Sequence, residues 1–269
     1  MHRVMIQPAS YENCQEAVAR AFELFPQEIA GKTVVIKPNV LRSSTAEEHI
    51  VTHPCLLRAV VEKVEEMSPA AILVGDNPGL FSYGDNEKSF KITGLMDAAK
   101  GYYRNFGNLT QNLAFNPDFM PEVGVSKEIL DADILISLPK FKTHGLTIVT
   151  GAIKNSYGFL PGAQKARLHQ IAGSPERFHD VIVEVFRLRV PVGGEAILGN
   201  RALQDLMQSK THVRPQADPE LCTACGTCVE HCPVSALTMI EDLPVADTDI
   251  CITCFCCQEI CPEKAMALN

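Results

Sequence analysis

Two runs of cysteines near the C-terminal end of the sequence share one spacing. In each run, three cysteines are separated by two residues, and a fourth follows after three more, directly before a proline. The first run comprises Cys222, Cys225, Cys228 and Cys232, and the second comprises Cys251, Cys254, Cys257 and Cys261. Three thiolates on one short loop can hold three corners of a cubane iron–sulfur cluster, and the fourth corner needs a thiolate from outside that loop. The spacing therefore predicts two [4Fe–4S] clusters.

The same spacing predicts which cysteines act together. In bacterial ferredoxins with this pattern, the fourth cysteine of each run ligates the cluster of the other run. We therefore expect one cluster on Cys222, Cys225, Cys228 and Cys261, and a second on Cys251, Cys254, Cys257 and Cys232. Crossed ligation would keep the clusters close together and would stabilise a module too small for much of a core. Each cluster would pass single electrons.

Zinc and disulfides are the alternative roles for these cysteines. Zinc modules use paired Cys-x2-Cys elements with four ligands per metal, not two quartets that each end in Cys-Pro. Disulfides are disfavoured by the spacing and by a compartment that keeps thiols reduced. Among the other cysteines, we expect Cys256 to pack beside a cluster without ligating it, and Cys14 and Cys55 to be core residues of two helices.

The start of the sequence and its hydropathy favour a cytoplasmic protein. Its first residues lack the regions of a signal peptide, and no apolar run is long enough to span a bilayer. Residues 218–269 hold nine acidic residues and one base, a balance of −8 that equals the net charge of the whole chain. A concentrated acidic surface steers basic redox partners, although it also aids solubility. We expect a redox partner protein, no nucleic-acid partner and no membrane span.

Strands that alternate with helices predict an α/β fold for the rest of the chain. Continuous apolar or β-branched runs predict strands at 3–7, 33–37, 70–74 and 133–138. Helical spacing is found over about 17–25, 54–67 and 174–189. For the second of these helices we expect Thr52 as the cap and His53 at the start, whereas 80–125 indicates a loop with at least one helix. The order is typical of a mostly parallel sheet with flanking helices, followed by a small α+β module of bacterial-ferredoxin type.

A basic, glycine-bearing segment suggests a binding pocket. No acidic residue lies between Asp133 and Glu176, and the stretch begins where a predicted strand ends. Polar residues also follow the other strands, and the carboxyl ends of parallel strands share one edge, where ligands bind. The candidate pocket residues for an anionic small molecule, such as a carboxylate or phosphate, are Lys37, Asn39, Asp76, Lys140, Lys142, His144, Lys154 and Asn155. The alternative is a solvated basic loop or a docking face for the acidic tail, and His144 alone fits a structural role.

Two motifs resemble the signature of the DUF362 family. They are Ser137-Leu-Pro-Lys-Phe-Lys-Thr-His144 and Val149-Thr-Gly-Ala-Ile-Lys-Asn-Ser-Tyr-Gly158, and similar residues occur at 37–39, 52–54 and 75–76. The resemblance covers about residues 3–190 and the tail, because members frequently carry a two-cluster ferredoxin module at the C-terminus. It implies an α/β domain and iron–sulfur binding, and it implies no particular reaction. Relative to the family, the sequence from Val190 to Met207 is short.

These observations predict two domains and leave three classes of function open. We expect an α/β domain over 1–210, shortened after residue 190, a linker near 208–219, and a module with two [4Fe–4S] clusters over 216–269. The first hypothesis is an iron–sulfur oxidoreductase or its electron-transfer subunit, with the clusters serving the pocket. The second is a non-enzymatic carrier of ferredoxin type, and the third is a ligand-binding protein whose clusters are structural.

Overall fold

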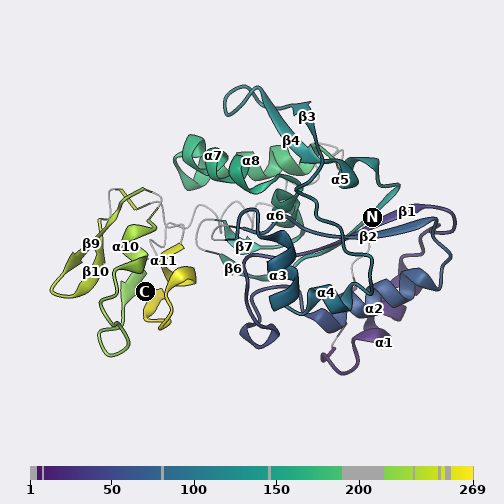
Figure 1. Cartoon of the computed structure of the whole chain (residues 1–269), viewed down its shortest axis with the longest axis horizontal. Helices are drawn as coiled ribbons and strands as arrows, with labels where there is room; N and C mark the ends of the chain where they lie inside the picture. Colours follow the sequence, from purple (N-terminus) through teal and green to yellow (C-terminus); the bar gives the residue numbers. More distant parts are fainter. Residues whose placement is uncertain are drawn as a thin grey trace. The chain divides into compact units, whose positions relative to one another are not determined.

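A computed structural model describes most of the chain, coloured along its sequence in Figure 1. The described residues are 5–7, 9–79, 82–144, 147–189, 215–232, 234–247, 250–251 and 256–268. They fall into two compact units, which we treat separately. The sheet unit comprises 1–142, 151–168 and 182–189, and the cysteine unit comprises 143–150, 169–181 and 190–269. Residues 190–214, with the short stretch and most of the expected linker, lie outside the described residues.

A parallel three-stranded sheet forms the centre of the sheet unit. Its strands are β1 (Thr33–Pro38), β2 (Ala71–Val74) and β5 (Ile134–Leu138), in the order β2-β1-β5. Val35 of β1 lies opposite Leu73 on one side and Leu135 on the other. A central strand that is covered on both faces requires a continuous apolar run, and β1 has one. The expected α/β class with a parallel sheet is therefore confirmed.

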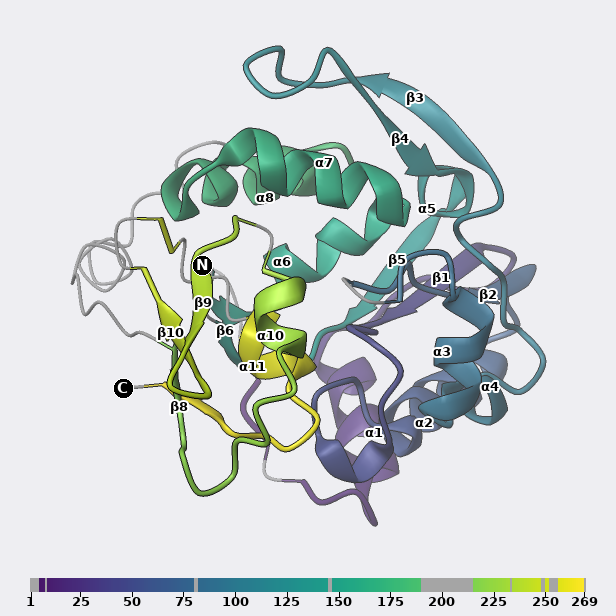
Figure 2. The same cartoon turned by 60° about the vertical axis from the view of Figure 1, so that its left-hand side comes forward.

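The helices α1 (Cys14–Leu24), α2 (Pro54–Glu65), α3 (Asn86–Ile92) and α4 (Leu95–Ala98) lie on one side of this sheet (Figures 1 and 2). The apolar positions of α2 recur at helical spacing, and Leu57, Val61 and Val64 are completely buried. They pack with β1, β2, α1 and α4 in one continuous core. Burial of this apolar stripe, more than intrinsic helix propensity, stabilises α2.

The start of α2 differs in one detail from the sequence-based expectation. The side chain of His53, not that of Thr52, caps the helix, because its Nδ1 accepts the N–H of Cys55 (3.2 Å). The hydroxyl of Thr52 accepts the N–H of Asn39 (2.8 Å) and donates to the carbonyl of Leu138. Thr52 therefore links the carboxyl ends of β1 and β5.

The middle of the chain contains more regular structure than its sequence pattern indicates. Besides α3 and α4, it forms an antiparallel hairpin of β3 (Thr110–Ala114) and β4 (Glu122–Ser126). Most residues of β3 are polar and exposed, so its sequence lacks the apolar alternation of a half-buried strand. At the N-terminus, residues 5–7 of the expected first strand are not in a strand, and residues 1–4 lie outside the described part.

Several short elements and two longer helices follow the hairpin. They are α5 (Lys127–Asp131), β6 (Lys142–His144), β7 (Ile148–Thr150), α6 (Ala152–Asn155), a 3-10 turn (Ser156–Phe159), α7 (Gly162–Ala172) and α8 (Pro175–Arg187). Here β5 differs from the expectation of a buried strand, because it lies at one edge of the sheet and is half-buried. No helix in the described part of the chain is long and apolar enough to cross a membrane.

The cysteine unit ends in a small α+β module. Its elements are β8 (Pro215–Ala217), α10 (Thr227–Glu230), β9 (Leu237–Ile240), β10 (Leu243–Ala246), α11 (Cys256–Ile260) and β11 (Met266–Leu268). Two antiparallel pairs form, β8 with β11 and β9 with β10. The helices α10 and α11 lie side by side in both views (Figures 1 and 2). Among its described residues, Cys228, Leu237, Cys257 and Met266 form a small buried cluster with a few half-buried neighbours.

Candidate functional site

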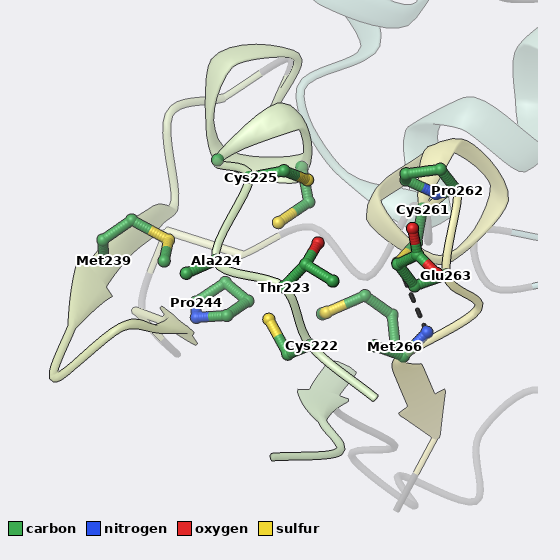
Figure 3. Close-up of a pocket in the computed structure, with 13 residues that line it drawn as sticks. Cys222, Thr223, Ala224, Cys225, Met239, Pro244, Cys261, Pro262, Glu263 and Met266 are labelled. Atoms are coloured by element: carbon green, nitrogen blue, oxygen red, sulfur yellow. Dashed lines mark hydrogen bonds between the residues drawn. The ribbon is translucent and has the colours of Figure 1, made fainter. Parts of the chain in front are cut away.

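One pocket of the cysteine unit is lined by four cysteines (Figure 3). Cys222 and Cys225 come from the loop that leads into α10, Cys228 lies in α10 itself, and Cys261 directly follows α11. Apolar side chains complete the lining, among them Met239, Pro244 and Met266. The four residues are the ligand set that the sequence assigns to one cluster, and they include the cysteine of the other run.

The loop before α10 is shaped to present its cysteines. Ala224 (φ 54°) and Gly226 (φ 73°) adopt left-handed conformations, and the second is favourable because glycine has no Cβ. A hydrogen bond with the hydroxyl of Thr227 lowers the pKa of Cys225 below that of a free thiol. Burial raises the pKa of Cys228, and the nearby Cys261 and Cys225 raise it further. The thiols are thus close enough to repel one another as thiolates, a repulsion that bound iron would offset.

The four thiols of this pocket suit the donor set of a cubane cluster. In the described part of the chain, no group of three or more His, Cys, Asp or Glu side chains is close enough to hold one metal ion. Zinc requires all its sulfur ligands within about 2.3 Å of one point. A cubane takes one thiolate at each of four separate iron corners, so its ligands surround a larger volume. Four cysteines around an apolar pocket match that requirement.

The two cysteine runs make the same contacts 29 positions apart. The N–H of Ala236 donates to Sγ of Cys232 (3.2 Å), and the N–H of Ala265 donates to Sγ of Cys261 (3.3 Å). Ahead of each run, the backbone of Asp218 binds the carbonyl of Ala265, and that of Asp247 binds the carbonyl of Ala236, both at 2.7 Å. The segment ahead of each run is therefore hydrogen-bonded to the segment that follows the other run. In the second run, Cys251 and Cys257 are described and Cys254 lies outside the described residues.

A second candidate site, which is polar, lies at the carboxyl ends of β1 and β2 in the sheet unit. Lys37 and Asp76 form an ion pair there (Nζ–Oδ1 2.7 Å), and their side chains are 1% and 2% exposed. Burial lowers the pKa of Lys37 and raises that of Asp76, and the attraction between the two groups opposes both shifts. The carboxylate also accepts the backbone N–H groups of Val40 (2.7 Å) and Asn77 (2.9 Å). Such bonds offset the large cost of removing both charges from water.

The third part of this site comes from Asn155 in α6 and Gly158 in the 3-10 turn that follows. Oδ1 of Asn155 accepts a hydrogen bond from Lys37 Nζ (3.0 Å) and a longer one from Nδ2 of Asn39 (3.4 Å). Oδ1 of Asn39 is buried and has no hydrogen-bond partner among the described residues. A Cβ at position 158 would overlap the carboxylate of Asp76 and lie 2.7 Å from Lys37 Nζ. Only glycine leaves room for the ion pair at this position.

Lys165 is a second buried lysine of this site, and sequence reasoning assigned it only to the basic stretch. It is 2% exposed, and its Nζ donates to the carbonyls of Asn77 (2.7 Å) and Pro78. Burial lowers its pKa to about 7; the charge of Asp76 opposes the shift, and the charges of Lys37 and Lys154 add to it. The only signal in the sequence is the absence of acidic residues around it.

The structure brings together four of the eight candidate pocket residues, Lys37, Asn39, Asp76 and Asn155. The others have their own contacts. Lys140 Nζ binds the hydroxyl of Tyr11 (3.0 Å), and Lys142 Nζ binds the carbonyl of Ile50 (2.9 Å). Lys154, in α6, is half-buried and close enough to influence Lys165. His144 belongs to the cysteine unit, where its Nδ1 accepts the N–H of Thr147 (3.2 Å).

The close approach of Gly158 to the ion pair gives a first prediction. Gly158→Ala should lower the free energy of unfolding of the sheet unit by roughly 3 kcal/mol, because the methyl group forces a buried pair apart. Gly151→Ala is the matched control, since its nearest neighbour would be a ring carbon of Phe141 at 3.9 Å. Denaturant unfolding followed by circular dichroism measures both. Equal stability of the two variants would contradict this role of Gly158.

The lowered pKa of Lys165 predicts a dependence of stability on pH. Its pKa is about 7 in the folded protein and 10.5 as a free group. A lowered folded-state pKa contributes stability that is present above pH 10.5 and is lost as the pH falls towards 7. The free energy of unfolding should therefore rise by up to about 1.4 kcal/mol per pH unit within this window. Lys165→Met should remove this slope in denaturant titrations, whereas exposed Lys91→Met should keep it.

Comparison with known proteins identifies the family of most of the chain. Residues 34–213 match the model of the family described as Domain of unknown function (DUF362), and residues 215–238 match a 4Fe-4S binding domain. Over 165 residues, the chain is 30% identical to a thylakoid-associated protein of Synechocystis sp., which covers 60% of this chain. The chain spans only half the length of that curated relative. Because the DUF362 model matches more than half of the residues of this chain, the chain belongs to the DUF362 family, and it carries a 4Fe-4S binding domain.

Proposed function

We propose that this protein transfers electrons through two [4Fe–4S] clusters held by crossed ligation. The position of Cys261 carries the proposal, because it lines one pocket with Cys222, Cys225 and Cys228 although it belongs to the other run. The matched 4Fe-4S binding domain, 215–238, contains the whole first run and ends before the second. The arrangement supports Cys222, Cys225, Cys228 and Cys261 as the ligands of one cluster.

The repeat extends the proposal to a second cluster. Cys232 bears the same backbone N–H···S hydrogen bond as Cys261, at the equivalent position of its run. It packs against the small core that contains Cys257. By this equivalence, Cys232 joins Cys251, Cys254 and Cys257 on the second cluster.

The protein residues would hold the clusters and adjust their potentials. A bound [4Fe–4S] cluster supplies one-electron transfer. The N–H groups of Ala236 and Ala265 donate to the sulfurs of Cys232 and Cys261, and such donors stabilise the more negative, reduced state. Met239, Pro244 and Met266 limit the access of water to one pocket. The excess of acidic residues over 218–269 favours a redox partner with a basic surface, in the cytoplasm.

Crossed ligation can be tested with one cysteine of the first run. Cys232→Ser should lower the iron content of anaerobically purified protein from about eight to about four per chain. The lost signal should belong to the cluster of Cys251, Cys254 and Cys257. Cys256→Ala is the control and should retain about eight iron atoms. Iron analysis with electron paramagnetic resonance of the reduced proteins measures this, and loss of a cluster from the Cys256 variant would refute the ligand assignment.

We further propose that the edge of the parallel sheet binds an anionic small molecule, which would make the protein an iron–sulfur oxidoreductase or its electron-transfer subunit. Two buried lysines, Lys37 and Lys165, face one carboxylate, Asp76, so the site has an excess of positive charge when both lysines are protonated. The pKa of Lys165, about 7, would rise when an anion binds beside it. Asn39 adds a buried oxygen that no described residue binds and that a ligand hydroxyl could satisfy. Lys140, Lys142, Lys154 and Asn155 complete the proposed set of pocket residues in this unit.

The pocket proposal is tested at its two outermost lysines. Lys140→Gln with Lys142→Gln should weaken the binding of inorganic phosphate by about a hundredfold or more, because each charged hydrogen bond contributes roughly 1.5–3 kcal/mol. Iron content should not change. The control is Lys88→Gln with Lys91→Gln on α3, where both side chains are exposed. Isothermal titration calorimetry measures the affinities, and equal affinity in both double variants would remove Lys140 and Lys142 from the pocket.

A further inference from the structure

Two cysteines outside the cluster runs meet in the sheet unit. The sulfur atoms of Cys14 and Cys55 are 2.7 Å apart, about 0.7 Å more than the bond length of a disulfide. They are 41 residues apart in sequence, so the fold brings them together. Cys14 is the first residue of α1, and Cys55 is the second residue of α2. A shift of a few tenths of an ångström by each side chain would allow a bond.

The surroundings hold the two thiols in contact. The helices α1 and α2 pack along each other, and Val18 and Leu57 lie in the same core as Cys14. The carbonyl of Tyr11 accepts a hydrogen bond from the thiol of Cys55 (2.9 Å), which leaves the sulfur of Cys55 free to accept one from Cys14. The packed helices thus hold the two sulfurs within reach of each other.

The two sulfurs differ in their access to solvent. Cys14 is 4% exposed, whereas Cys55 is half-buried. Burial raises the pKa of Cys55 to about 12, and the neighbouring Cys14 adds to the shift. Cys55 therefore rests as a thiol at neutral pH. A small disulfide reagent can reach Cys55 first, and Cys14 is in position to react next.

We propose that Cys14 and Cys55 are a reversible dithiol–disulfide pair that links α1 to α2 when it is oxidised by a small-molecule disulfide. In the first step, Cys55 loses its proton and its sulfur attacks one sulfur of the reagent, which releases one thiol and leaves a mixed disulfide. Cys14 then loses its proton and attacks Sγ of Cys55, which forms the Cys14–Cys55 bond and releases the second thiol. The two protein thiols lose two electrons and two protons, and the reagent gains both.

The link would constrain the part of the chain that carries the buried ion pair. The segment that it closes, from 14 to 55, contains β1 with Lys37 and also Thr52, whose hydroxyl joins β1 to β5. A cross-link over a segment of this length disfavours the unfolded state. Oxidation would thus stabilise the sheet unit mainly by restricting its unfolded state.

Peptide mapping of the full-length, cluster-containing protein tests the proposal. The protein is equilibrated without oxygen in mixtures of reduced and oxidised glutathione, alkylated and digested. We expect a linked peptide pair that contains Cys14 and Cys55 and that disappears on reduction. Cys14→Ser should accumulate a glutathione adduct on Cys55, whereas Cys55→Ser should leave Cys14 unmodified because it is buried. If both cysteines of the unaltered protein remain fully alkylated in the most oxidising mixture, the pair does not exist.

Thermal unfolding tests the effect of the link. Oxidation should raise the Tm of the sheet unit by about 10 °C, and a reductant should reverse the rise. The double variant Cys14→Ala, Cys55→Ala should show no such shift in the same mixtures, and visible absorbance checks that the clusters are equally intact. A linked peptide without a change in Tm would overturn the stabilising role, as would an equal shift in the double variant.

Discussion

The buried ion pair between Lys37 and Asp76 is the interaction on which the sheet unit depends. Two charges that are almost completely removed from water are tolerated only when each has several polar partners. Those partners come from distant parts of the chain: Val40 and Asn77 from the ends of two strands, and Asn155 from α6. Since all of them must be in place together, the pair couples the strand ends to the segment that follows β5. A polar centre of this kind also makes one packing arrangement much more favourable than its alternatives.

The cysteine unit meets a different constraint, because it has almost no apolar core. In the described part of its C-terminal module, one small cluster around Cys228, Leu237, Cys257 and Met266 cannot offset the entropy of ordering a module of this size. The proposed clusters would supply the missing stabilisation through covalent metal–sulfur bonds. Met266 belongs to this cluster and also lines the pocket of the four cysteines, together with Met239. Structure and cofactor binding are therefore hard to separate in this part of the chain.

Features that follow from local sequence were predicted better than features that depend on tertiary packing. The parallel strands followed from β-branched runs, and the grouping of Cys222 with Cys261 followed from spacing alone. The position of Lys37 and Asp76 at one sheet edge followed from strand order. By contrast, nothing local marks Lys165 as buried or Gly158 as a contact of the ion pair, because both depend on how a later segment packs. The polar strand β3 escaped prediction because its stability comes from pairing with β4.

The strand pairing of the cysteine unit has a consequence for its biosynthesis. Its first strand, β8, pairs with its last, β11, and the carbonyl of Ala265 binds the backbone of Asp218. A ribosome adds residues in order, so the cysteines of the first run emerge well before Cys261, with which they share a pocket. Nascent chains would therefore expose several reactive thiols without their final partner. Chaperones or cluster-assembly proteins that recognise this open state would have a defined interval in which to act, which closes when β11 joins β8.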